Sequence, residues 1–168
     1  MPEPLDPERL FRALDEQAVD YVLIGDLAAV LHGSPLVTND ADICPRREPD
    51  NLRRLAAALR GLDARLRTAT EPAGVAFACD AESFEHMQMV NMATSAGAFD
   101  VSFEPAAFPG YDTLKQRAVP MVVYGVTVHV ASLRDIIESK QVASRLQDQA
   151  TLPHLYALAD EIDRTIEP

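Results

Sequence analysis

Two carboxylates one residue apart, Asp40 and Asp42, are the side chains of this sequence whose type and spacing could do chemistry. They open a short apolar segment that continues with Ile43 and Cys44 and is typical of a β-strand. Because residues i and i+2 of a strand point to the same face, the two carboxylates should project side by side. Adjacent carboxylates repel each other unless a cation lies near both. A hard divalent ion, Mg²⁺ above all, is the expected partner for such oxygen ligands.

The same pair also has an ordinary interpretation. The chain carries 26 acidic residues, so an Asp-x-Asp pair can arise by chance, and the preceding Thr38 and Asn39 are typical of a turn into a strand. A third carboxylate favours the site, because Asp100 lies within another apolar segment, residues 98–103. Alternation along that segment places Asp100 and Ser102 on the face opposite to its large apolar side chains.

A glycine upstream of the pair adds a feature suited to binding an anion. Gly25 lies between an expected strand at residues 19–24 and an expected short helix at residues 26–31. A helix N-terminus presents free backbone amides and a positive dipole, and glycine lets a phosphate approach the backbone closely. Cations that bridge carboxylates and a triphosphate would activate an attacking hydroxyl and stabilise the departing pyrophosphate. These residues therefore indicate nucleotidyl transfer, which depends mostly on positioning and charge.

Apolar periodicity predicts helices and strands that alternate along the chain. Beyond the segments above, it predicts helices at 7–18, 49–61, 133–143 and 152–162 and strands at 41–44 and 86–91. Residues 121–124 and 126–130, separated by Gly125, are expected to form two short paired strands or one bulged strand. Residues 68–83 are weakly patterned and read as a loop with a short strand at 75–79. In the strand expected at 86–91, Met87, Met89 and Asn91 should face the core. The order predicts an α/β fold, with a mixed β-sheet flanked by helices, as a single domain over residues 1–168.

Composition and charge limit the classes of function. The net charge of −11 argues against a protein that wraps nucleic acid over a broad surface, because phosphate neutralisation drives such binding. Two cysteines show neither metal-ligand nor disulfide spacing, which suits a reduced, cytoplasmic setting. The acidic, proline-bearing start of the sequence is unlike a signal or transit peptide, and no apolar run is long enough to cross a membrane.

Arginines are concentrated just after the Asp pair. Seven of the fifteen basic residues fall within this stretch: Arg46, Arg47, Arg53, Arg54, Arg60, Arg65 and Arg67. They could form a local patch that faces an anion. The alternative is a solvated helix face whose charge is balanced by acids elsewhere.

The segment IGDLAAVLHGSPLVTNDADI resembles the signature of the polymerase-β-type nucleotidyltransferase superfamily, a glycine followed by Gly or Ser, a gap, and then Asp-x-Asp. Its flanks are most similar to the minimal bacterial branch, which includes the AbiEii-like and MenT-like toxin nucleotidyltransferases. SLRDIIESKQVASRLQDQATLPHL resembles the later helical motif of that branch, with Lys140, Arg145 and Asp148 in matching places. The resemblance covers most of residues 19–160.

The resemblance implies roles for particular residues. Gly25 would be the glycine that a phosphate approaches, and Asp40, Asp42 and Asp100 would be the catalytic carboxylates that hold the metal, with two Mg²⁺ ions expected. Lys140 would contact the triphosphate of the NTP substrate, although a solvated helix lysine is an equal alternative. Ser34 could touch the nucleotide, or it could be an ordinary turn serine.

One residue departs from the family pattern. Asp26 stands where the family has Gly or Ser, so a carboxylate is placed where an anionic phosphate should lie. Aspartate is a favoured N-cap, and in that role Asp26 could exclude the nucleotide. It could also point away from the site or act as a further metal ligand.

Three functions follow from these observations. The first is an Mg²⁺-dependent nucleotidyltransferase that moves a nucleoside monophosphate from an NTP to a hydroxyl of an RNA or protein. By resemblance, the acceptor would be a tRNA end or a partner protein in a toxin–antitoxin system, with a homodimer or an antitoxin-like chain as partner and no membrane association. The second is a catalytically impaired protein of the same fold that acts as a nucleotide-binding or regulatory module, which Asp26 favours. The third is a plain interaction domain whose Asp pair is only a turn.

Overall fold

A seven-stranded mixed sheet organises the molecule. The computed structural model describes residues 2–166, in which the strands lie in the order β3-β4-β5-β2-β1-β7-β6. The strands are β1 (Tyr21–Ile24), β2 (Asp40–Pro45), β3 (Arg65–Leu66), β4 (Met89–Thr94), β5 (Gly97–Ser102), β6 (Val119–Val123) and β7 (Val126–Val130). β2 and β5 are neighbours and run parallel, whereas β1 and β2 are antiparallel. The strands that carry the three predicted carboxylates therefore lie side by side in the middle of the sheet.

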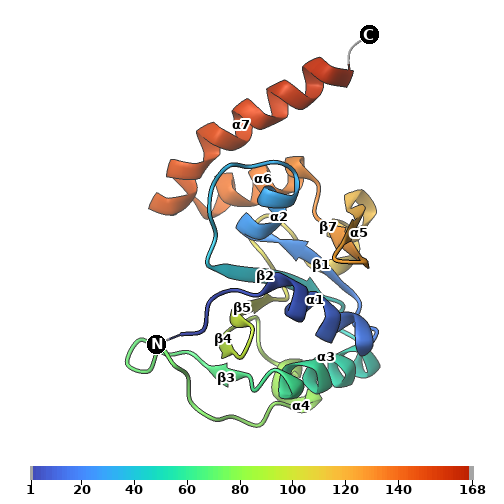
Figure 1. The fold of residues 1–168 in the computed structure, drawn as a ribbon, viewed down its shortest axis with the longest axis vertical. Helices are drawn as coiled ribbons and strands as arrows, with labels where there is room; N and C mark the ends of the chain where they lie inside the picture. Colours follow the sequence, from blue (N-terminus) through green and yellow to red (C-terminus); the bar gives the residue numbers. More distant parts are fainter. Residues whose placement is uncertain (1, 167–168) are drawn as a thin grey trace.

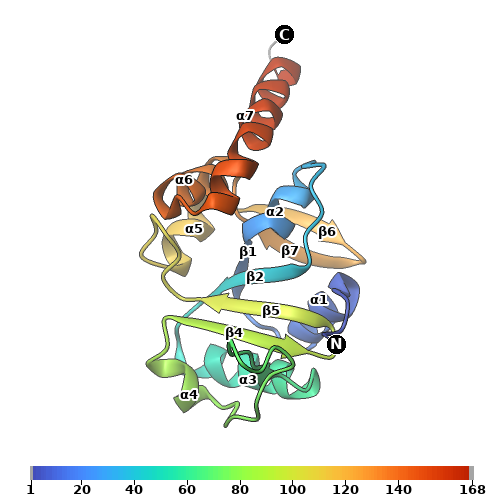
Figure 2. The ribbon, with the colours of Figure 1, turned by 90° about the vertical axis from the view of Figure 1, so that its left-hand side faces the viewer.

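Helices lie at both ends of the sheet (Figures 1 and 2). They are α1 (Pro7–Glu16), α2 (Gly25–Leu31), α3 (Pro49–Gly61), α4 (Ala81–Glu85), α5 (Tyr111–Arg117), α6 (Leu133–Ala143) and α7 (Leu146–Ile166). Helices α1, α3 and α4 gather toward one end, while α2, α6 and α7 gather toward the other, and α7 projects beyond the body of the molecule. The prediction of an α/β fold with a mixed sheet flanked by helices is confirmed.

Local sequence signals explain where several helices begin. The side chain of Asp6 accepts a hydrogen bond from the Arg9 amide at the start of α1, at 3.0 Å. Ser132 does the same for Asp135 at the start of α6, at 3.1 Å. Each cap satisfies an amide that has no partner within its own helix, so both helices begin where the sequence predicts.

The core lies between the sheet and the helices that cover it. Apolar side chains of β2 and β5 are fully buried, among them Ala41, Ile43, Phe99 and Val101. Alternation then turns the intervening residues of both strands, including the predicted carboxylates, toward the other face. The strand predictions for residues 41–44 and 98–103 were right in position and in face.

The strand predicted at 86–91 was wrong in its bounds and in its buried face. It begins at Met89 and buries Val90 and Met92, while Met89 is 62% exposed. Because side chains alternate between the two faces of a strand, Val90 and Met92 face the core in place of the predicted Met89 and Asn91. Likewise, residues 75–79 form no strand, because only Val75 bridges Leu66.

Candidate active site

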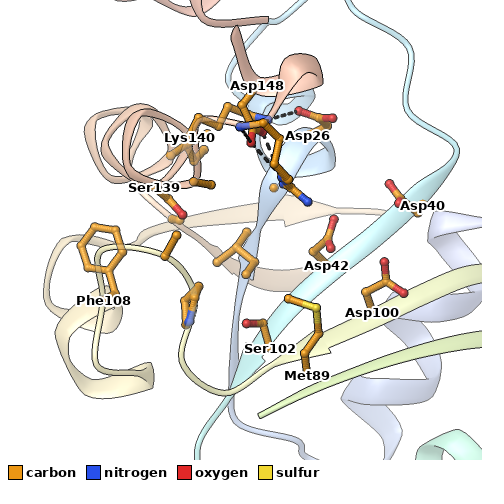
Figure 3. A pocket seen from close by; sticks show the side chains of 18 of the residues that line it. Asp26, Asp40, Asp42, Met89, Asp100, Ser102, Phe108, Ser139, Lys140 and Asp148 are labelled. Atoms are coloured by element: carbon orange, nitrogen blue, oxygen red, sulfur yellow. Dashed lines mark hydrogen bonds and ion pairs between the residues drawn. The ribbon is translucent and has the colours of Figure 1, made fainter.

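Three predicted carboxylates lie on neighbouring strands at one pocket. Asp42 of β2 is in register with Asp100 of β5, and Asp40 is in register with Ala98. All three aspartates line the same cavity of about 470 Å³. Figure 3 shows their carboxylates on the same side of the two strands. The structure therefore brings together side chains that are up to sixty positions apart in the sequence.

Gly25 makes room for one of these carboxylates. It begins α2 with a φ of +72°, a left-handed conformation that suits glycine. A Cβ placed on it would lie 2.6 Å from Oδ2 of Asp42, which is a steric clash. Gly25 thus leaves room for Asp42 against the backbone, and the approach of a phosphate to this glycine stays a prediction.

Asp26 does not cap α2. Ile24 is the N-cap residue and makes no side-chain capping bond, and Asp26 lies in the first turn. Its carboxylate instead forms an ion pair with Nζ of Lys140, at 2.7 Å (Figure 3). The capping role considered for Asp26 is therefore wrong, and its negative charge is balanced within the pocket.

Lys140 is buried and held by two carboxylates. Its Nζ lies 2.7 Å from Asp26 and 3.4 Å from the fully buried Asp148. Asp148 also accepts hydrogen bonds from the backbone amide and the guanidinium of Arg145, at 3.2 and 2.8 Å. The alternative of a solvated helix lysine is thus excluded. These four residues form an ion-pair network that joins α2, α6 and α7.

Arg67 was not predicted as a site residue. It follows β3, and its NH2 group donates to Oδ1 of Asp100 at 2.6 Å. Its side chain is 30% exposed, and it lines the pocket with the carboxylates. Arg67 lies between the helix expected at 49–61 and the weakly patterned residues 68–83, so only the pairing of β3 with β4 and of β4 with β5 reveals its place.

Six other arginines of the same stretch make contacts elsewhere. Arg47, Arg54, Arg60 and Arg65 donate to backbone carbonyls, and Arg46 and Arg53 pair with nearby acids. The stretch therefore does not form a free patch for an anion. The alternative of locally balanced arginines is the better description.

The pKa values show that negative charge is concentrated in the pocket. Burial, with the nearby charges of Asp40, Asp100 and Asp26, raises the pKa of Asp42 from 3.8 to about 7. Burial also raises the pKa of Asp100, although the hydrogen bond from Arg67 opposes this shift. Such values are typical of carboxylates that lie close together without enough positive charge.

An apolar wall completes the cavity. Phe108, Leu114, Ile136 and Ala131 line it together with the carboxylates, and Figure 3 shows Phe108 on the side away from Asp40 and Asp100. Ser34 is not among the lining residues; it is buried, and its hydroxyl accepts a bond from the Leu36 amide. The interpretation of Ser34 as a turn residue therefore fits, and a direct contact with a nucleotide does not.

A divalent ion fits part of this donor set. Over residues 2–166, no group of three or more His, Cys, Asp or Glu side chains is arranged to hold a metal ion. Asp40 and Asp42 nevertheless project from the same strand face, and no ion pair to either is found in that part of the chain. Mg²⁺ commonly binds one or two protein carboxylates and completes its octahedron with water and substrate phosphates. The two aspartates fit that mode of binding.

No helix in the described part of the chain combines the length and the apolar character needed to cross a bilayer.

No protein-family profile and no curated protein matches the sequence. Among solved structures, the chain is similar to one described as a "putative nucleotidyltransferase" from Thermotoga maritima, with a TM-score of 0.53 and 14% sequence identity. The match covers 90% of this chain and 94% of the other. The chain therefore has a nucleotidyltransferase-like α/β fold.

Proposed function

We propose that this protein is a divalent-cation-dependent nucleotidyltransferase that moves a nucleoside monophosphate from an NTP to a hydroxyl of an RNA or protein. The observation that carries the proposal is the convergence of Asp40, Asp42 and Asp100 at one pocket of this fold. A cavity of about 470 Å³ is in the usual range for a small-molecule site.

Each part of the pocket has a role in this reaction. Asp40 and Asp42 would hold Mg²⁺, which supplies charge stabilisation at the phosphates. Lys140 lines the same pocket and would exchange its contact with Asp26 for one with a phosphate oxygen. The apolar wall around Phe108 and Ile136 would take the base.

The chemistry then needs one bond to form and one to break. The acceptor oxygen attacks the α-phosphorus, the bond to the β-phosphate oxygen breaks, and pyrophosphate leaves. The hydroxyl proton passes to a pocket carboxylate, and Asp100 is suited to accept it because its pKa is raised. A second ion would also need Asp100, whose carboxylate is bound to Arg67 in this structure.

A catalytically impaired nucleotide-binding module is the second candidate. The observation that favours it is the pairing of Lys140 with both Asp26 and Asp148, because a lysine held by two carboxylates is less available to bind a phosphate. Asp26→Ser removes one of these partners and restores the residue type of the related family. If Asp26 silences the site, we expect Asp26→Ser to tighten Mg-NTP binding about tenfold or more, equivalent to ~1.4 kcal/mol. Isothermal titration with several Mg-NTPs measures this; equal affinity with turnover by the wild type would show that Asp26 is harmless.

Transfer itself is tested with α-labelled NTPs, Mg²⁺ and a mixture of cellular RNA and protein as acceptors. We expect label in one acceptor class, loss of transfer in Asp42→Asn, and no loss in the surface variant Asp163→Asn. Binding of Mg-NTP without any transfer would favour the impaired module, and absence of both would favour a plain interaction domain.

The proposal extends to the acceptor molecule and to the cellular compartment. The resemblance to the AbiEii-like and MenT-like branch supports a tRNA end or a partner protein as acceptor, with a second copy or an antitoxin-like chain helping to hold it. Both cysteines, Cys44 and Cys79, are free thiols, which supports a reduced cytoplasmic setting. Mass spectrometry of labelled acceptors distinguishes RNA from protein.

A further inference from the structure

The charges around the pocket are unevenly matched. Cations line it at three positions, and each is already paired: Lys140 with Asp26, Arg145 with Asp148 and Arg67 with Asp100. The carboxylates of Asp40 and Asp42 are the pocket aspartates for which residues 2–166 supply no ion pair. A cation from outside the chain would therefore neutralise Asp40 and Asp42, whereas Asp100 already has a positive partner in Arg67.

Arg67 differs from the other arginines of its stretch. Arg65 donates to the carbonyl of Gly74, and Arg60 donates to that of Cys79, so both fasten the chain between β3 and α4. Arg67 instead reaches a carboxylate in the pocket, at 2.6 Å. Its buried Nε atom has no hydrogen-bond partner, so the contact with Asp100 is what holds the guanidinium there.

We propose that Arg67 takes the place of a second cation at Asp100, so that the pocket without nucleotide binds one divalent ion, at Asp40 and Asp42. The inference rests on the proposed function, since it concerns the same site. Arginine is always charged and binds carboxylates with a fixed planar fork. A dication at Asp100 would have to lie beside this guanidinium, and the repulsion disfavours it. In place of the two ions that the resemblance implies, the pocket would hold one ion and one arginine.

Counting bound Mn²⁺ tests the proposal without any turnover. Free Mn²⁺ is followed by electron paramagnetic resonance as it is titrated into the whole protein in the absence of nucleotide. We expect one Mn²⁺ per chain in the wild type. Arg67→Met should bind a second Mn²⁺ at least tenfold more tightly than any second site of the wild type, because the competing charge is gone.

Two control variants separate charge from structure. Arg65→Met removes a positive charge two positions away and should keep the count at one, since Arg65 does not line the pocket. Arg67→Lys keeps the charge and should also bind one ion. A second ion in Arg67→Met but not in Arg67→Lys therefore reports the charge itself, even where the methionine variant is less stable.

The possible Mn²⁺ counts distinguish failure of the proposed role of Arg67 from failure of the proposed function. Two equally tight ions in the wild type, unchanged in Arg67→Met, would overturn the role of Arg67 and leave the proposed function standing. No Mn²⁺ bound by any variant would overturn both. One ion in the wild type that persists in Asp42→Asn would place that ion elsewhere and would also overturn the inference.

Discussion

Asp42 is the side chain on which burial and charge repulsion act together. It lies on a central strand, near three other aspartates, and against the backbone of Gly25. Its pKa of about 7 means that the folded protein holds a proton there that the unfolded chain would release near pH 4. The charged form of Asp42, which is the form that the proposed cation would bind, therefore destabilises the folded state.

The stability of the protein should fall as Asp42 ionises. Because the pKa is higher in the folded state, the stabilising effect is complete below the unfolded value and is lost as the pH rises through about 7. From pH 5.5 to 8.5, wild type should lose about 2 kcal/mol more unfolding free energy than Asp42→Asn. Urea unfolding at several pH values measures this, with Asp163→Asn as the control for removal of one exposed charge.

Added Mg²⁺ should restore part of that stability at pH 8.5 in the wild type and not in Asp42→Asn, since a ligand of the folded state raises its stability. Parallel pH profiles for wild type and Asp42→Asn would contradict the raised pKa.

Gly25 and Gly125 form a matched pair for testing the close approach of Asp42. Both have positive φ, +72° and +76°, so alanine costs about 1–2 kcal/mol of backbone strain at either position. Only at Gly25 does the new Cβ also meet Asp42, because Gly125 has nothing within 4 Å. We expect Gly25→Ala to lower stability more than Gly125→Ala and to weaken Mn²⁺ binding at least tenfold. Equal Mn²⁺ affinity in the two variants would show that Asp42 can move aside without cost.

At the scale of elements, α6 and the turn between α6 and α7 place Lys140 and Arg145 at the pocket, opposite the carboxylates of β2 and β5. Ser132 fixes the start of α6, and Lys140 then reaches the pocket two turns later. Asp135, near the start of α6, is fully buried and pairs with Arg117 of α5 at 2.6 Å. The helix is thus anchored at one end by α5 and at the other by Asp148 of α7.

Asp148→Asn tests the anchor at the α7 end. The variant leaves Lys140 and Arg145 without their buried counter-charge, and we expect a loss of about 2–4 kcal/mol in unfolding free energy. Urea unfolding beside the exposed control Asp163→Asn measures it. A difference within the usual range of surface substitutions, roughly 0.5 kcal/mol, would mean that Arg145 and Lys140 are adequately solvated without Asp148.

The sequence predicted the elements whose signals are local and missed those that depend on distant contacts. β2 and β5 were predictable because apolar residues alternate with polar ones along both. Arg67 was not, because its partner lies 33 positions away and β3, only two residues long, leaves too short a pattern to recognise. Asp26 misled the prediction for a similar reason: a helix-start aspartate favours a cap, and only the packing of α6 against α2 gives it a lysine instead.

At the scale of the whole molecule, the net charge limits which nucleic acids can bind. The net charge is −11, and the arginines between positions 46 and 67 are bound to carbonyls or acids of the same chain. These seven arginines thus already have partners within the chain, which leaves them less suited to neutralising a phosphate backbone. An acceptor RNA would have to be recognised at its end or through a partner chain.

Sequence-independent RNA should therefore bind poorly. At physiological salt we expect a dissociation constant weaker than about 10⁻⁴ M, the upper end of the usual non-specific range. Fluorescence anisotropy with a short random RNA measures it, and repetition at lower salt shows the electrostatic share. Tighter binding with a steep salt dependence would show that some of the arginines exchange their internal partners for phosphates.

The position of Arg67 in the sheet has a consequence for how the pocket opens. β2 and β5 are central strands, whose amides should be among the slowest to exchange with solvent, whereas β3 is a two-residue edge strand. Fraying of that edge would free Arg67 from Asp100 at a small fraction of the global unfolding free energy. Asp40, Asp42 and Asp100 thus lie in the part of the fold that should persist longest, whereas Arg67, the proposed competitor of a second ion, lies in one of the first parts expected to open. Access of a second ion would then follow the local opening rate of one sheet edge, which amide exchange at Leu66 and Arg67 reports directly.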